Sequence, residues 1–409
     1  MSIINTNVMS LNSQRNLAAN NASLGTTIQR LSSGLRINSA KDDAAGLAIS
    51  ERFTTQIRGL NQAARNANDG ISLSQTAEGA LAEIGNNLQR VRELAVQSSN
   101  ATNSSTDRDA LQAEVTQLQA EIQRVASQTE FNGTKLLDGN FAGQAFQVGA
   151  NAGQLITVDS IASAQTSALG GTLFAERTFT ATVGTSDADT SGSFDHGAVN
   201  IASFTITNPS NGSAVTFDAI SIAAETANSG TGNAAAAELR GQNKVGAALV
   251  SAINAKSGEA GVVASLDDAT GEVTIQSLAS GKVGDTLATN LAGADAAVAL
   301  AAGDEAFVDS VDISSFAGAQ KAIGIMDSAL TAVNSSRAEL GAIQNRFSSV
   351  ISNLNTTSEN LSASRSRIRD TDFAKETAEL TRSQILNQAG TAMLAQANQV
   401  PQSVLSLLR

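Results

Sequence analysis

The sequence predicts a mainly α fold: a discontinuous bundle of long helices with terminal coiled-coil arms and an inserted α+β, β-rich outer module. Two observations predict this fold class. Apolar residues recur at alternating spacings of three and four over long stretches at both ends of the chain. Between residues 170 and 310 the composition changes to Ala, Gly, Ser, Thr and Asp. Because the helical pattern returns after this module, the two ends must pack together.

The stretch from Asp43 to Ser98 carries the longest apolar pattern. Its positions alternate fours and threes from Ile49 to Ala95, and only Ser74 among them is polar. A helix of this length would extend about 84 Å at 1.5 Å per residue, so it needs long partner helices. Asn68-Asp69-Gly70 is typical of a turn, and a break there is the alternative. We expect one continuous helix, because the apolar phase continues across Gly70.

Two further helices provide partners for this stretch. Ser105 or Thr106 is expected to cap a helix whose apolar positions run from Leu111 to Val125. The short connection predicts an antiparallel hairpin, and Asn132-Gly133 predicts a tight turn after it. The second partner runs about 45 residues from Ala317, and Ser364–Asp372 interrupts it.

Each terminus carries a shorter apolar stripe with no globular core beside it in sequence. Residues 1–41 contain four basic residues and no acidic one. Such segments are marginal as isolated helices in water, so we expect coiled-coil arms that fold on assembly; a flexible amphipathic arm is the alternative. The predicted arm residues are Ile4, Val8, Leu11, Leu24, Ile28, Leu31, Leu35, Leu386, Met393, Val400, Val404, Leu407 and Leu408.

These patterns predict three domains. The arms comprise residues 1–42 and 364–409, and the long-helix domain with a small β region comprises 43–169 and 311–363. Residues 170–310 form the variable, surface-exposed module, with short strands and one helix near Asn243–Ala255.

Composition excludes several classes of site. The chain has no Cys and a single histidine, His196, so disulfide frameworks, cysteine-based zinc sites, cysteine nucleophiles and HExxH metalloproteases are excluded. We find no catalytic set and no phosphate-binding loop, and we expect neither an enzyme nor a bound cofactor or metal. No run of 18 apolar residues predicts a membrane span. The N-terminus does not resemble a secretory signal peptide.

Charge separates the middle of the chain from its ends. Residues 140–315 hold eighteen acidic and five basic residues, whereas the remainder holds twenty acidic and twenty-one basic residues. An acidic middle makes nucleic acid an unfavourable partner. Ends close to neutrality are compatible with self-association.

Both ends closely resemble bacterial flagellin, over about residues 1–165 and 315–409. Runs of this length at both ends are more specific than any short motif. Within the module, Leu249–Asp268 is similar to a repeat found inside flagellin variable regions, which is a weaker match. The stretches that carry the main resemblance are Ile4–Asn12, Gln29–Ser50, Leu88–Gln97, Ser364–Ala374 and Val404–Arg409.

The resemblance implies a secreted structural subunit that self-assembles into the hollow helical filament of the extracellular bacterial flagellum, used for swimming motility. It implies that the subunit is exported unfolded by the flagellar type III export apparatus. The implied partners are other copies of the chain, a flagellin chaperone, the filament cap and hook-filament junction proteins. Neither nucleic acid nor membrane insertion is implied.

The resemblance also implies a binding site for the host Toll-like receptor 5. An ordinary contact between subunits is the simpler interpretation of the same surface, and the two are compatible. The matching residues are Gln89, Arg90, Leu94, Gln97, Leu111, Glu114 and Gln117.

Three alternatives were weighed against this hypothesis. A hook-filament junction protein shares the plan of arms and long helices. A metallopeptidase in the module is excluded by the single histidine. An adhesive role for the acidic module is permitted, but no particular residue supports it.

Overall fold

The computed structural model describes residues 6–141, 143–183, 197–207, 212, 214–224, 234–278, 280–283, 285–291, 294, 300 and 305–406. They form two compact units. The first comprises Met1–Gly70, Ala145–Thr157 and Asn345–Arg409, and the second comprises Ile71–Gln144 and Val158–Gln344. The three-domain division inferred from the sequence stays a prediction.

The longest helix confirms the prediction for the central stretch. Helix α2 (Ala44–Ser98) is continuous through Gly70, and Ser74 is fully buried among its apolar neighbours. In the first unit, Leu60 and Ala63 of α2 form a small core with Leu354. Leu354 belongs to α6 (Phe316–Arg369). Long apolar stripes therefore bury each other along paired helices, as the spacing of three and four predicts.

Helix α6 is longer than predicted. The sequence indicated an interruption from Ser364, but the helix continues to Arg369, and only residues 370–372 separate it from α7 (Phe373–Ser406). Alternating Ser and Arg residues end the apolar stripe at Ser364 without ending the helix. The end of an apolar stripe therefore does not mark the end of the helix.

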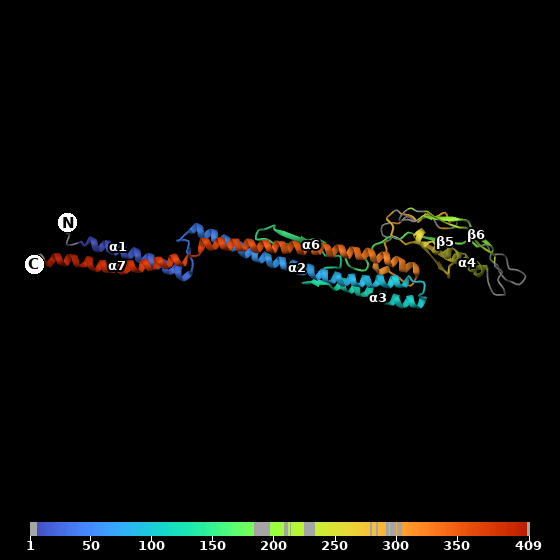
Figure 1. Ribbon diagram of the computed structural model, residues 1–409, viewed down its shortest axis with the longest axis horizontal. Coiled ribbons are helices and arrows are strands. Elements are labelled where there is room, and N and C mark those ends of the chain that lie inside the picture. Colours follow the sequence, from blue (N-terminus) through green and yellow to red (C-terminus); the bar gives the residue numbers. More distant parts are fainter. Residues whose placement is uncertain are drawn as a thin grey trace. The chain divides into compact units, whose positions relative to one another are not determined.

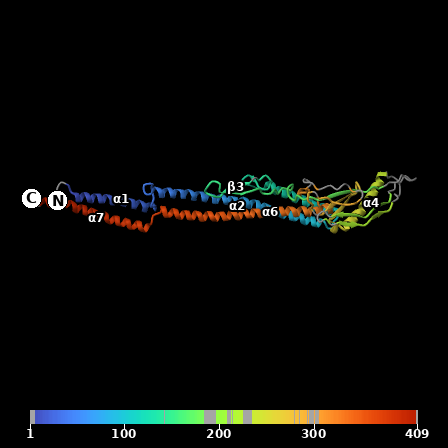
Figure 2. The same cartoon turned by 90° about the horizontal axis from the view of Figure 1, so that it is seen from above.

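In the first unit, α1 (Val8–Ser33) lies beside α7 in both views (Figures 1 and 2). Gly34 ends α1 in the left-handed conformation at φ 72°, and its N–H donates to the carbonyl of Arg30. The hairpin of β3 (Gln144–Gln147) and β4 (Leu155–Val158) contacts α2, where the Asn66 side chain donates to the Gln147 carbonyl at 3.0 Å.

In the second unit, α3 (Ser105–Gln128) follows α2 after a short connection. Its N-cap is Ser104, one residue before the predicted cap. The Ser104 hydroxyl accepts from the Asp107 N–H, and the Asp107 carboxylate accepts from the Ser104 N–H, a capping box. After α3, the predicted turn is confirmed: Asn132 and Gly133 have φ of 50° and 80° between β1 (Glu130–Phe131) and β2 (Thr134–Lys135).

The module in the second unit combines one long helix with small antiparallel sheets. Helix α4 (Ala234–Ala255) packs on β10 and β11 of the three-stranded sheet β10-β11-β5. Two further strand pairs, β6–β9 and β7–β8, complete the described sheets, and in β7–β8 the rings of Phe204 and Phe217 stack at 4.9 Å. The remaining bounds are β5 Glu176–Thr180, β6 Val199–Ile201, β7 Phe204–Thr207, β8 Ala214–Phe217, β9 Ile220–Ile222, α5 Ser257–Ala260, β10 Val262–Asp267, β11 Glu272–Ser277 and the 3-10 helix Val308–Ser310.

Candidate interaction surfaces

Helices α1 and α7 pair antiparallel, and side-chain hydrogen bonds join them at several levels. Asn7 donates to the carbonyl of Ala397 at 2.8 Å, and Asn20 donates to the carbonyl of Ser383 at 2.9 Å. The Ser10 hydroxyl donates to Asn398 at 2.8 Å, and the Asn387 amide donates to Asn21. The pairing of the two ends is therefore substantially polar.

Buried and half-buried positions of both helices recur at spacings of three and four, which defines the face that each presents to the other. We call this face the polar seam, because most of its members are polar or small. In α1 it comprises Ser10, Ser13, Leu17, Asn20, Leu24, Thr27 and Leu31, and in α7 it comprises Glu376, Leu380, Ser383, Asn387, Gly390, Leu394 and Ala397.

The structure places the predicted arm residues in two environments. Leu24, Leu31 and Leu35 are half-buried, as the stripe requires. Val8 and Met393, in contrast, are 53% and 65% exposed, and Leu11, Ile28 and Leu386 are about half exposed. The predicted stripe followed the most apolar residues, and the pairing of the two arms leaves these five side chains exposed. Their part in filament assembly stays a prediction.

We call the exposed set the outer apolar face of the arms. It leaves large hydrocarbon side chains in water on both helices, an arrangement typical of a surface that another molecule covers. Ile4, Leu407 and Leu408 lie outside the described residues, and Val400 and Val404 belong to α7 without a described side chain. The described members of the face are Val8, Met9, Leu11, Ile28, Phe373, Ile385, Leu386 and Met393.

At the base of the arms, the two chain segments hold each other through backbone groups. Leu35 forms an antiparallel bridge with Asp370, and the Arg36 N–H donates to the Arg369 carbonyl at 2.7 Å. Beside them, Asp42 accepts hydrogen bonds from the backbone N–H groups of Ser39 and Asn38, which lower the pKa of its carboxyl. Backbone pairing therefore joins the two segments at the base of the arms, next to the buried side chain of Ile37.

A second surface lies on the hairpin of α2 and α3. Arg90 forms ion pairs with Glu114 at 2.9 Å and Glu93 at 3.1 Å, and its hydrogen bonds to Glu114 and then Glu93 raise the pKa of the guanidinium. Gln89, Gln97 and Gln117 are exposed beside this cluster. These side chains are available to a partner from outside.

Two of the predicted receptor residues differ from the rest in burial. Leu94 is 1% exposed, so its side chain belongs to the helical core and supports the surface from beneath. Leu111 is half-buried. The apolar spacing of α2 places Leu94 on the buried face with Val91 and Ala95. This spacing in the sequence could have predicted that Leu94 is buried.

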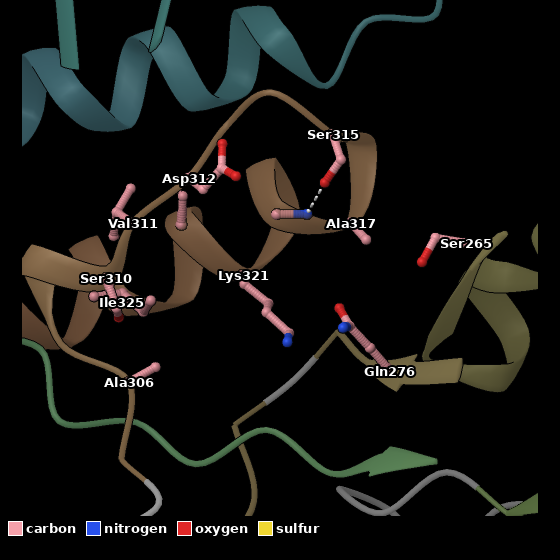
Figure 3. Close-up of a pocket in the computed structure, with 12 residues that line it drawn as sticks. Ser265, Gln276, Ala306, Ser310, Val311, Asp312, Ser315, Ala317, Lys321 and Ile325 are labelled. Carbon is pink, nitrogen blue, oxygen red and sulfur yellow. Dashed lines mark hydrogen bonds between the residues drawn. The ribbon is translucent and has the colours of Figure 1, made fainter. Parts of the chain in front are cut away.

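The second unit also contains a polar pocket of about 330 Å³ beside the N-terminal part of α6. Figure 3 shows Lys321 extending toward Gln276, with Ser315 bonded to a backbone N–H of the helix. Lys321 is paired with Glu176 at 3.2 Å, and Gln276 donates to the same carboxylate at 3.0 Å. The charges at this pocket therefore satisfy one another.

The search for chemistry gives no reactive cluster in the part of the chain that the structure describes. Within it, no group of three or more His, Asp or Glu side chains is placed to hold a metal ion. His196 lies outside the described residues. Among the described residues, no helix is long and apolar enough to span a membrane.

Comparison with protein families gives matches at both ends of the chain. Residues 4–142 match the bacterial flagellin N-terminal helical region, and residues 323–408 match the bacterial flagellin C-terminal helical region. These ranges include the arms, α3, the greater part of α6 and the whole of α2.

Curated relatives match over nearly the whole length. The chain is 41% identical to the B-type flagellin of Pseudomonas aeruginosa, and the match covers 99% of each chain. It is 42% identical to flagellin D of Vibrio anguillarum and to flagellin B of Vibrio cholerae, again over 99% of each chain.

Among solved structures, FliC from Burkholderia pseudomallei matches with 24% identity and a TM-score of 0.37 over 68% of this chain and 99% of that one. The flagellar junction protein FlgL from Legionella pneumophila has 16% identity and a TM-score of 0.40 over 78% of this chain and 99% of that one. The sequence matches at both ends and the full-length curated relatives together show that this chain belongs to the bacterial flagellin family, the structural subunits of the flagellar filament.

Proposed function

We propose that this chain self-assembles through its arms into the hollow helical filament that drives swimming. The observation that carries the proposal is the outer apolar face, on which large side chains of α1 and α7 are exposed although the two helices already pair with each other. Burying such a face stabilises association by about 25 cal/mol per Å². Other copies of the chain, which carry the same face, are the partners that this geometry fits.

Assembly from the outside of the cell requires export, and we include in the proposal unfolded passage through the flagellar type III apparatus. A chaperone that covers the C-terminal arm, the filament cap and the hook-filament junction proteins complete the proposed partners. The outer apolar face gives the chaperone a physical role, because an exposed stripe of this kind promotes premature association. A junction protein is the weaker alternative, since the flagellins match at 41–42% identity and the junction protein at 16%.

Seeded growth tests the assembly proposal. Purified chain is added to sheared filament seeds, and filament length is measured by electron microscopy. We expect long hollow filaments from the intact chain and none after deletion of residues 1–40 or 370–409. Growth of either truncated chain would contradict the role of the arms.

A finer variant separates the outer face from the rest of the arm. Replacing Leu11, Ile28, Leu386 and Met393 with Gln removes apolar area while each helix keeps its polar seam. We expect growth to stop, with the α2–α6 helices still folded by circular dichroism. Val283→Gln, which changes an exposed apolar side chain of the module, is the matched control and should grow normally.

We also propose that the Arg90 surface binds Toll-like receptor 5 in the free subunit. Support comes from exposed charged and amide side chains gathered on adjacent faces of α2 and α3. Arg90→Ala is expected to lower receptor activation in a cell reporter assay, while filaments still grow. Arg124→Ala, which breaks a comparable exposed pair with Glu121, is the control. Equal loss in both variants would contradict the site.

A further inference from the structure

We propose that the polar seam fixes the register of α1 against α7, so that the two arms of one chain pair in a single antiparallel alignment. This inference rests on the proposed function, because that alignment decides which side chains the outer apolar face offers to other copies. The residues that specify it are the side chains bonded to each other across the seam, Ser10 with Asn398 and Asn21 with Asn387, together with Gly390, where a side chain is missing.

A shifted register would leave polar side chains of α1 and α7 without their hydrogen-bond partners. A slip of one heptad keeps the spacing of three and four, so apolar periodicity alone does not oppose it. The slip would place Asn21 opposite Leu380 or Leu394 in place of Asn387, its present hydrogen-bond partner. Asn387 would lose this bond. The slip would also separate the Ser10 hydroxyl, whose residue is 7% exposed, from its acceptor Asn398, and an unsatisfied buried group is more costly than a hydrogen bond is favourable.

Gly390 lies next to Leu17 and also favours the observed register. A methyl group at this position would lie 3.2 Å from Leu17 Cδ1, so the absence of a side chain makes room for Leu17. After a slip of one heptad, Leu17 would meet Ser383 or Ala397 at that level. Both carry a Cβ, so the space is available to Leu17 in one alignment.

The arms bury polar residues between them and expose larger apolar ones, which indicates that their pairing is selected for alignment. A seam built from Val8, Leu11, Ile28, Leu386 and Met393 would bind more tightly, yet the chain exposes these residues and buries Ser10, Thr27 and Ser383. Polar residues within a coiled-coil seam lower stability and specify alignment. The polar seam therefore gives specificity to the pairing within one chain, and the outer apolar face is left for association.

Because the chain contains no cysteine, introduced pairs report the register without background. The in-register pair combines Asn21→Cys with Asn387→Cys. Two out-of-register pairs combine Asn21→Cys with Leu380→Cys or with Leu394→Cys. Each full-length chain is treated with a short thiol crosslinker, as monomer and as seeded filament, and intramolecular product is separated from intermolecular product by its mobility on a denaturing gel.

With Ser10, Asn398 and Gly390 unchanged, we expect the in-register product to exceed either out-of-register product by about tenfold, the factor that loss of one buried hydrogen bond implies. Combining Ser10→Ala and Gly390→Ala with each cysteine pair should raise the out-of-register products several-fold relative to the in-register product. Asn16→Leu, at an exposed position of α1, is the matched control and should leave the ratio unchanged.

Equal yields from the three pairs, or no in-register product, would overturn the inference. An unchanged ratio in the Ser10→Ala and Gly390→Ala chain would remove these residues from the mechanism. Filament growth is measured separately. If filaments grow while the three crosslink yields are equal, the register inference fails and the assembly proposal is kept. If filaments do not grow while the in-register product still dominates, the assembly proposal fails and the register inference is kept.

Discussion

Gly70 lies in the middle of α2 at a point where helix and aromatic ring meet. A methyl group there would come within 2.6 Å of Phe347 Cζ. The Phe347 side chain is fully buried, and its ring lies 5.7 Å from that of Phe146 in an edge-to-face arrangement. The turn-like segment Asn68-Asp69-Gly70 therefore serves close packing within a continuous helix.

Gly70→Ala tests this packing. Ala is favoured over Gly in a helix by about 1 kcal/mol, whereas overpacking a core costs about 1–3 kcal/mol. We expect a net loss of about 1 kcal/mol in the free energy of unfolding, measured by urea denaturation. Gly79→Ala in the same helix meets no other atom within 4 Å among the described residues and should raise stability. A gain in both variants would contradict the steric account.

The capping box at Ser104 gives a pH-dependent prediction. Hydrogen bonds from the Ser104 hydroxyl and then its N–H lower the pKa of Asp107. A carboxyl whose pKa is lower in the folded than in the unfolded chain stabilises the fold at pH values above its unfolded pKa of about 3.9. This stabilisation is lost as the pH falls through the folded pKa. Asp107→Asn should therefore lower the melting temperature at pH 7, and this difference should shrink as the pH falls below about 3.9.

Asp109→Asn is the control for this prediction. It removes a carboxylate from the same turn, and Asp109 makes no side-chain hydrogen bond or ion pair among the described residues. A drop in melting temperature equal to that of Asp107→Asn at pH 7 would show that charge near the helix start, and not the capping box, is responsible.

At the scale of elements, α3 anchors the two segments that lead into and out of the module. Gln123 accepts from the N–H and hydroxyl of Thr166. Gln119 donates to the Val308 carbonyl at 2.6 Å, and Gln112 accepts from the Ile313 N–H at 2.7 Å. Glutamine side chains on one helix thus satisfy backbone groups of buried, irregular segments.

Gln112→Leu tests this anchoring. It leaves the Ile313 N–H without its acceptor in a place where the Ile313 side chain is fully buried, and an unsatisfied buried donor costs about 1–3 kcal/mol. We expect a loss of that size in the free energy of unfolding. Gln117→Leu, an exposed position of the same helix, should change it little. Similar losses in the two variants would argue against a specific anchor.

The accuracy of the sequence reading varied between elements for physical reasons. The long helices were predictable because more than ten apolar positions repeat in one phase along α2. The sequence predicted short strands in the module, but β6 and β9 have three residues each, too few to show a period. Ser104 caps α3. Both Ser104 and Thr106 have an Asp three residues later, the pattern of a capping box, so the local sequence did not decide between them.

At the scale of the molecule, the module joins the rest of the second unit through a narrow connection. Thr172 and Ala306 form an antiparallel bridge, with N–H to carbonyl distances of 3.1 and 2.7 Å. Beyond them the module has its own core, which includes Val245, Leu249 and Val273. The first and last segments of the module are therefore paired with each other.

Replacing residues 173–305 with a two-residue turn tests this independence. We expect the shortened chain to keep the helical circular dichroism of α2, α3 and α6 and to grow filaments from seeds at a rate near that of the intact chain. The reason is that the bridge between Thr172 and Ala306 and the glutamine anchors remain. Loss of growth with folding intact would place essential contacts between copies in the module.

The sequence by itself determined the long helices, the returning helical end, the acidic module and the family, because each depends on patterns many residues long. The tertiary structure decided which face of the arms pairs within the chain. Asn20, Ser383 and Gly390 carry no apolar signal, yet they lie between the two helices, while Leu11 and Met393 lie outside. Apolar periodicity predicts that a helix has a face to bury. Which side chains of the partner helix cover that face is decided only in the tertiary structure.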